Sequence, residues 1–222
     1  MLQPYFLHRE MDVIEAGCGR SWPEEFYSPL LSIIGIDSDE VALQLRTDLK
    51  QAIAGDVCKV DIPGESADLV YSSFVLEHVR GAQRALENFV KWTRPGGLII
   101  IRVPDRNSVY GVVTRFTPLW VHVAYKRFIE NYYRAGEPGY GPYPTYHEKI
   151  CSRSGLNEFC ASNGCEVVED RLVNLYLSLS KFRRLKKSIA MAVWLGSLGR
   201  FSWRHDNICF IIRKLPAVAS TV

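Results

Sequence analysis

The sequence predicts an α/β protein built on a mainly parallel sheet, and three observations support this class. The first half alternates short apolar runs, typical of strands, with segments that carry apolar residues at helical spacing. The 222 residues are 47% hydrophobic and 23% charged, which suits one globular domain with extensions and excludes disordered, collagen-like and coiled-coil chains. The first strand candidate ends at a Gly-x-Gly turn, as in many βα units.

Five strands are expected in the first half. They are Asp12–Ala16, Ser32–Ile36, Ala52–Ala54, Asp68–Ser73 and Leu98–Val103. Apolar spacing predicts helices over Asp39–Lys50 and Ala82–Trp92. Residues 21–24 (SWPE) resemble a capping box that would open a helix after the first strand. Residues 94–97 (RPGG) are expected to stop the helix at 82–92 and turn into the last of these strands.

The second half is less regular. Asp105–Lys149 is long, aromatic and rich in Pro and Gly around residues 136–146 (GEPGYGPYPTY). Ser154–Asn163 is expected to form a helix, and Cys165–Val173 and Asn207–Lys214 to form two strands. Between these strands lies a basic, apolar stretch, Lys181–Arg204, which is expected to be helical.

The order of strand, glycine turn, helix and acid-tipped strand is suited to a nucleotide-like ligand. Gly17 and Gly19 let a ligand approach the backbone because no Cβ intervenes. Asp37 follows the second strand, where a carboxylate can accept from both hydroxyls of a ribose. The same pattern also suits a tight βα connection without a ligand, so other motifs have to decide.

Five segments are similar, in order and spacing, to the motifs of class I S-adenosylmethionine-dependent methyltransferases. They are residues 13–19 (VIEAGCG), 35–37 (GID), 55–57 (GDV), 68–79 (DLVYSSFVLEHV) and 94–97 (RPGG). The chain most resembles the small-molecule branch often called methyltransferase type 11. The resemblance covers residues 12–104, whereas the C-terminal half resembles the family only in layout. A nicotinamide-binding Rossmann domain fits less well, because its third glycine would fall at Trp22.

The resemblance implies one domain over residues 1–222 with a Rossmann-like seven-stranded sheet, its last strand antiparallel, helices on both faces and an inserted lid. Residues 12–104 would form the cofactor-binding core, 105–150 the substrate lid, and 175–206 a basic insertion between the last two strands. Because ligands bind beyond the carboxyl ends of parallel strands, we expect both insertions to leave that rim and face the cofactor mouth.

The resemblance also implies S-adenosyl-L-methionine as the cofactor and assigns roles at its methionine end and its ribose. Gly17 and Gly19 would line the methionine end, with Glu15 near the amino group. Asp37 would hold the ribose diol.

Further roles concern the adenine and the sulfonium. Asp56 would accept from the adenine amino group, while the Val57 amide donates to the ring. Ser72 and Ser73 would lie beside the sulfonium. In one departure from the family, its usual third glycine is Ser21 here. In another, only a short segment precedes the first strand, so either another segment closes the site or the start codon is misplaced.

A general base, if the reaction uses one, is expected among the histidines, whose pKa suits proton transfer near neutral pH. His78 follows the fourth strand and is typical of a pocket wall in this family, with base catalysis as the alternative. His147 follows the lid and would act as a base over the site, or pair with the neighbouring glutamate. His122 is expected to be structural, and His205 to bond to the neighbouring aspartate.

The two insertions differ in composition from the rest of the chain. Asp105–Lys149 holds ten of the aromatic residues, and Arg171–His205 holds eight Lys or Arg and no acid. One interpretation is a solvated basic face over an extra core. The other is a basic, aromatic surface at residues 181–204 that makes peripheral contact with anionic lipid head groups and admits a lipid-linked acceptor.

Composition also limits the partners and the compartment. The net charge is +3 and no aromatic-basic RNA motif occurs, so no nucleic acid is expected. The six cysteines lack metal-ligand spacing, so no metal is expected, and reduced thiols suit a cytoplasmic protein. The expected function is methyl transfer from S-adenosyl-L-methionine to a small-molecule or lipid-linked acceptor. The alternative is a non-catalytic module of the same fold that binds a partner or a membrane surface.

Overall fold

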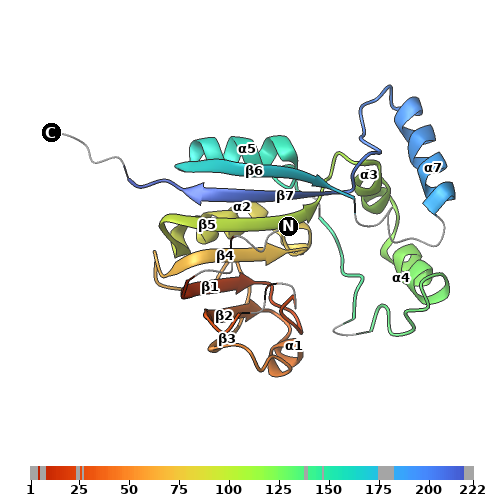
Figure 1. Cartoon of the computed structure of the whole chain (residues 1–222). Helices are drawn as coiled ribbons and strands as arrows, with labels where there is room; N and C mark the ends of the chain where they lie inside the picture. Colours follow the sequence, from red (N-terminus) through yellow and green to blue (C-terminus); the bar gives the residue numbers. More distant parts are fainter. Residues whose placement is uncertain are drawn as a thin grey trace.

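The computed structural model describes residues 5, 9–23, 26, 28–137, 140–146, 148–174 and 183–217. Its centre is a seven-stranded sheet with the order β3-β2-β1-β4-β5-β7-β6 (Figure 1). The strands are β1 (Met11–Ala16), β2 (Leu31–Asp37), β3 (Gln51–Ala54), β4 (Ala67–Ser73), β5 (Thr93–Pro104), β6 (Cys165–Val173) and β7 (Asn207–Lys214). Strands β1 to β5 pair in parallel, whereas β7 is antiparallel to both β5 and β6. The predicted fold class, with its antiparallel last strand, is confirmed.

Two helices cover one face of the sheet, and aromatic residues cover the other. Helices α2 (Ala82–Trp92) and α5 (Arg153–Ser162) pack their apolar residues against the larger core cluster. On the opposite face, Trp22 and Phe26 pack against Tyr71, with ring centroids 5.4 and 6.0 Å from it. Both faces are therefore shielded, as a sheet of mostly parallel strands requires.

Helix α2 has the bounds that its apolar spacing predicts, and a distant residue caps its start. The backbone amides of Gly81 and Ala82 donate to the two carboxylate oxygens of Glu148 at 2.7 and 3.0 Å. A carboxylate suits this position because the first amides of a helix have no partner within it. The end of the lid segment is thus tied to the core.

Two local predictions in the first half were wrong, and a third was right only in part. Residues 21–23 are not helical, so Ser21 does not cap a helix there, and Trp22 is buried in the core instead. The helix expected at 39–50 is only α1 (Glu40–Gln44), since the chain then turns Arg46 inward to a buried carboxylate. Helix α2 ends before residues 94–97, as predicted, but these residues lie within β5 as a bulge between two pairings with β4.

The two insertions emerge at the same edge of the sheet, because β5 and β7 run in opposite directions. The Asp105 amide donates to Asp206 O at 2.9 Å, which joins the two departures from the sheet. The insertions contain α3 (Val109–Phe116), α4 (Leu119–Phe128) and α7 (Arg183–Gly196). These helices stand together as a lobe beyond the sheet (Figure 1), and α3 contacts α7. The shared rim is confirmed, as is a helix within 181–204, but α3 and α4 were not predicted.

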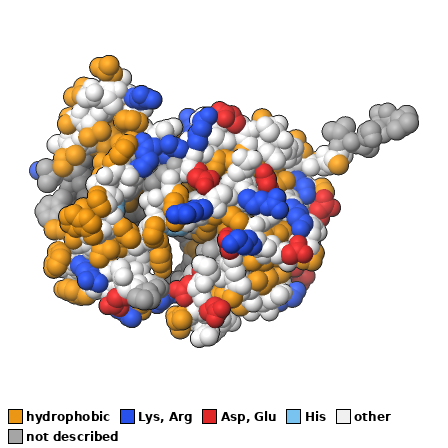
Figure 2. Space-filling view, turned by 180° about the vertical axis from the view of Figure 1, so that it is seen from behind, with side chains coloured by type: hydrophobic (Ala, Val, Ile, Leu, Met, Phe, Trp, Pro, Cys, Tyr) orange, Lys and Arg blue, Asp and Glu red, His pale blue; other side chains and the backbone are white. Residues whose placement is uncertain are grey.

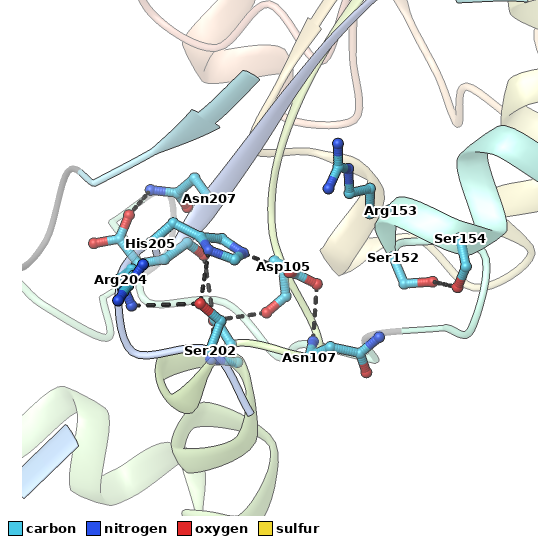
Figure 3. A network of polar contacts seen from close by, with 12 residues as sticks. Asp105, Asn107, Ser152, Arg153, Ser154, Ser202, Arg204, His205 and Asn207 are labelled. Carbon is cyan, nitrogen blue, oxygen red and sulfur yellow. Dashed lines mark hydrogen bonds and ion pairs between the residues drawn. The ribbon is translucent and has the colours of Figure 1, made fainter. Parts of the chain in front are cut away.

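A buried polar network fastens the insertions to each other (Figure 3). The imidazole of His205 bonds to Asp105 Oδ2 at 2.7 Å through Nε2 and to Ser202 Oγ at 2.9 Å through Nδ1. The partner of His205 is therefore Asp105, not the neighbouring Asp206 as predicted. His122 bonds to Thr117 Oγ1 at 2.7 Å, in line with a structural role.

Within the described parts of the chain, no helix combines the length and apolarity needed to cross a bilayer.

Candidate functional site

A cavity of about 700 Å³ lies at the carboxyl ends of β1, β2 and β4, and we call it the strand-end cavity. It lies where the strand order reverses between β1 and β4, the usual ligand site of such sheets. Of the predicted site residues, it is lined by Gly17, Gly19, Asp37, Asp56, Val57, Ser73 and His78. The motifs therefore converge on one hollow, although their contacts to a cofactor stay predictions.

The glycine turn after β1 needs glycine for two different reasons. Gly17 has φ +76°, and a Cβ there would lie 2.1 Å from Val75 Cγ2, so the Val75 side chain already fills this space. Gly19 has φ +54°, and a Cβ there would meet nothing within 4 Å. Because Gly19 lines the strand-end cavity, that open space is available to a ligand.

Asp37 joins the end of β2 to the glycine turn. Its Oδ2 accepts from the Gly19 amide at 2.7 Å, and its Oδ1 accepts from the Asp39 amide at 2.9 Å. A carboxylate oxygen has room for a second donor, so both oxygens can still accept from ligand hydroxyls. Asp37 can thus shape the turn and bind the ligand at once.

Asp56 and Val57 line the cavity after β3, at the turn expected to hold an adenine. Asp56 Oδ1 accepts from the Cys58 amide at 2.9 Å, and Lys59 Nζ lies 3.4 Å from Oδ2. The Asp56 side chain is 43% exposed, whereas Val57 is buried. An apolar side chain beside an accepting carboxylate fits a purine with an amino group.

The structure does not bring Glu15 to the strand-end cavity. Its carboxylate is buried and pairs with Arg46 Nη2 at 2.7 Å, while Arg46 Nη1 donates to Cys18 O at 2.6 Å. Burial raises the pKa of the Glu15 carboxyl, although the facing guanidinium lowers it. Glu15 therefore supports the glycine turn through Arg46, and no sequence signal had marked Arg46.

Ser72 and Ser73 lie on opposite sides of β4, because successive strand residues alternate. Ser73 lines the strand-end cavity, whereas Ser72 is buried and not among the lining residues. The strand period could have shown that only one of this pair reaches the site.

His78 lies in the short 3-10 helix η3 (Leu76–His78) after β4. Its Nδ1 is 2.8 Å from Pro144 O, and since a carbonyl only accepts, Nδ1 carries the proton. Burial lowers the pKa of His78, so the ring is neutral at pH 7 and Nε2 keeps its lone pair. The other histidine predicted as a base, His147, lies outside the described residues.

The lid loop after α4 closes part of the strand-end cavity, as expected for the first insertion, although the residues that do so were not singled out from the sequence. Tyr143, Pro144 and Tyr146 line it, whereas no described residue of the second insertion does. The Arg20 guanidinium lies 4.2 Å from the Tyr140 ring centroid, and that of Arg80 lies 4.8 Å from Tyr146. These cation–π contacts hold the loop to the core from two sides. The expectation that both insertions face the cavity is therefore met by the first alone among the residues described.

A second hollow of about 450 Å³, the lid cavity, adjoins the first. It lies between η3, the lid helices α3 and α4, and residues 141–145. The two cavities share Phe74, His78, Tyr143 and Pro144 as lining residues. Phe74 has φ +58°, a costly conformation for a bulky residue and one that often marks functional sites. Ligands bound in the two cavities would therefore lie next to each other at these shared residues.

The residues present fit an adenosyl cofactor. The strand-end cavity offers open space above Gly19, and its lining includes two carboxylates, Asp37 and Asp56, for a ribose and an adenine. A metal site is a poorer fit, because no cluster of three or more ligating side chains occurs among the described residues.

Comparison with known proteins supports the same conclusion. Residues 14–101 match the family model described as "Methyltransferase domain", of type 11. A curated protein of Mycolicibacterium smegmatis, named a probable S-adenosylmethionine-dependent methyltransferase, is 28% identical over 102 residues. The match covers 43% of this chain and only 38% of that relative.

Solved structures match over almost the whole chain, at low sequence identity. An S-adenosylmethionine-dependent methyltransferase from Archaeoglobus fulgidus aligns with a TM-score of 0.57 and 19% identity, covering 95% of this chain and 89% of that one. The 4+2 cyclase SpnF aligns with a TM-score of 0.58 and 13% identity, covering 95% of this chain and 77% of that one. These structures confirm the fold. The match of residues 14–101 to the methyltransferase model supports the family resemblance and, with it, S-adenosyl-L-methionine as the cofactor, while the reaction is not fixed by the fold.

Proposed function

We propose that this chain, which carries a class I S-adenosylmethionine-dependent methyltransferase domain, methylates a small-molecule or lipid-linked acceptor held in the lid cavity. The observation that carries this proposal is the set of lining residues shared by the two cavities, which would let a second ligand lie beside the first. S-adenosyl-L-methionine, when bound, supplies the methyl group and its own leaving group.

The protein's own contribution is mainly binding, orientation and exclusion of water. Asp37, Asp56 and the glycine turn would hold the cofactor, while Tyr143 and Tyr146 cover the cavity. His78 lines both cavities, and its unprotonated Nε2 can accept a proton from an acceptor hydroxyl or amine.

Titration calorimetry with S-adenosylhomocysteine tests the proposal at its base. The native chain should bind, and Asp37→Asn should weaken binding by about ten- to a hundredfold, because one accepting oxygen becomes a donor. Asp61→Asn is a matched control, since the Asp61 side chain is 91% exposed and pairs with Lys91 at the surface. Absence of binding to the native chain would refute the enzyme and favour the non-catalytic module.

SpnF has a similar fold and is named a 4+2 cyclase, so an activity other than methyl transfer is the second possibility for this chain. Transfer of radiolabelled methyl groups from S-adenosyl-L-methionine to a small-molecule or lipid extract separates the two possibilities. Labelled product that disappears in Asp37→Asn would support methyl transfer.

The lipid-linked form of the proposal depends on the lobe of α3, α4 and α7. Several of its large apolar side chains are exposed, including Trp120 at 70%, Phe128 at 79% and Leu198 at 95%. Figure 2 shows hydrophobic side chains gathered on this projecting lobe, with Lys and Arg among them. No acid lies in residues 171–205, so the α7 side of the lobe suits peripheral contact with anionic head groups.

Sedimentation with vesicles tests this contact. The chain should sediment with phosphatidylglycerol vesicles in low salt, and less with phosphatidylcholine vesicles or in high salt. Trp120→Ser with Leu198→Ser should reduce sedimentation severalfold. Val41→Ser, exposed at 61% on α1, should not. If the native chain, the Trp120→Ser/Leu198→Ser variant and Val41→Ser sediment equally, membrane contact through this lobe is removed from the proposal.

A further inference from the structure

The lid cavity differs from the strand-end cavity in the charges it presents. Arg115 and Lys126 line it from α3 and α4, and both side chains are half-buried. Neither forms an ion pair with a carboxylate among the described residues. Both cations lie near aromatic rings instead. The Arg115 guanidinium is 4.9 Å from the centroid of the Phe116 ring, and Lys126 Nζ is 5.8 Å from the centroid of the Tyr132 ring.

Two arginines that support the core, Arg46 and Arg94, have carboxylate partners. Arg46 pairs with Glu15 at 2.7 Å, and Arg94 pairs with both Asp12 and Asp68 at 2.9 Å. Partial burial of a cation without an anion is costly, since the charge loses water and gains no partner. The two lid cations therefore have unused capacity to bind an anion.

Glu77 also lines the lid cavity, but its carboxyl does not neutralise the charges of Arg115 and Lys126. Glu77 is buried, and its Oε2 has no hydrogen-bond partner among the described residues. Burial raises the pKa of Glu77 to about 8, so the carboxyl is mostly uncharged at neutral pH. It comes from η3 at the shared wall, whereas the cations come from the lid helices. One end of the cavity is thus neutral and polar, and the other is cationic.

We propose that the acceptor carries a carboxylate or phosphate, which binds to Arg115 and Lys126 while the rest of the molecule reaches the wall at His78. This inference rests on the proposed function and names its substrate class. The aromatic and hydroxyl side chains between these ends, such as Tyr110 and Thr114, suit an acceptor with an apolar or hydroxylated body.

Pairs of probes that differ only in charge test the inference. Binding to the chain saturated with S-adenosylhomocysteine is measured by ligand-observed NMR titration, using benzoate against benzamide for the carboxylate and phenyl phosphate against phenol for the phosphate. At least one anion should bind about tenfold more tightly than its neutral match, the scale of one charge-assisted hydrogen bond. The pair with the larger ratio identifies the anionic group.

Variants then locate the preference. Lys126→Met and Arg115→Gln should bring the ratio close to one, and Lys126→Arg should retain it. Lys50→Met removes the same charge from an exposed lysine just before β3, at the opposite edge of the sheet, and should leave the ratio unchanged. Thermal unfolding of each variant shows that the fold is intact.

Two outcomes would overturn the inference: equal binding of anion and neutral match by the native chain, or a preference that survives both lid substitutions. Failure of the proposed function would look different, because the native chain would then not bind S-adenosylhomocysteine in calorimetry.

Discussion

The strand-end cavity and the lid cavity share a wall but are built from different parts of the fold. The first is formed mainly by strand ends and tight turns, and its carboxylates are fixed by backbone amides, as Asp37 is by Gly19. The second is formed mainly by helices of an insertion, and it presents the cations Arg115 and Lys126 without carboxylate partners. The contrast indicates two separate roles. The strand ends and turns of the sheet would hold the cofactor, and the side chains of the lobe would select the acceptor.

The largest expected effect is on the turn that forms the first cavity. Gly17→Ala should lower the free energy of unfolding by about 2–4 kcal/mol, because its Cβ collides with Val75 and its φ is unfavourable. Gly19→Ala should cost only about 1 kcal/mol, since the space around it is open, yet it should abolish S-adenosylhomocysteine binding. Urea unfolding and calorimetry measure both quantities. Equal stability losses in the two variants would contradict this account of the turn.

A smaller effect comes from Glu77, which lines the lid cavity, and appears as pH dependence. Burial raises the pKa of Glu77 from 4.5 to about 8, so between these values the folded chain keeps a proton that the unfolded chain releases. The contribution of Glu77 to stability is therefore fully present below pH 4.5 and should be lost as the pH rises through 8.

Glu77→Gln should remove part of this decline, on the order of 2 kcal/mol between pH 5 and pH 8. Urea unfolding at several pH values measures it. The buried Glu15 contributes in the same direction, so some slope should remain. An unchanged slope in Glu77→Gln would show that the Glu77 carboxyl is already ionised in the folded chain.

The smallest effect concerns the loop that joins the two cavities. Tyr146→Leu removes the cation–π contact with Arg80 and should weaken S-adenosylhomocysteine binding by about two- to fivefold. Tyr133→Leu is the matched control, because Tyr133 is 76% exposed and lines neither cavity. Identical affinities for both variants would show that the loop does not cover the ligand.

The sequence predicted the first cavity much better than the second. Strand ends were found because a buried strand followed by glycine or an acid has few alternatives, as at Gly17 and Asp37. The bounds of α2 were right because Ala85, Phe89 and Trp92 form a clear apolar stripe. Glu15 was misplaced because its partner Arg46 is 31 residues away, and no local pattern encodes a buried ion pair of that span.

The lid was predicted as a segment, but its helices α3 and α4 were not, for a different reason. Helix α4 has no buried residue, so it lacks the one-sided apolar spacing by which a core helix is identified. Arg115 and Lys126 likewise resemble ordinary surface cations until the helices are placed in space. Residues whose roles depend on how an insertion folds back cannot be assigned from spacing along the chain.

The buried bonds of His205 to Asp105 and Ser202 have an evolutionary consequence. They connect the end of β5 to the start of β7, so the two insertions are anchored at the same place on the sheet. A longer or shorter form of either insertion would strain these hydrogen bonds and so disturb the position of the other insertion. Substrate range and surface character are therefore expected to diversify together among the descendants of this chain, rather than as separate traits.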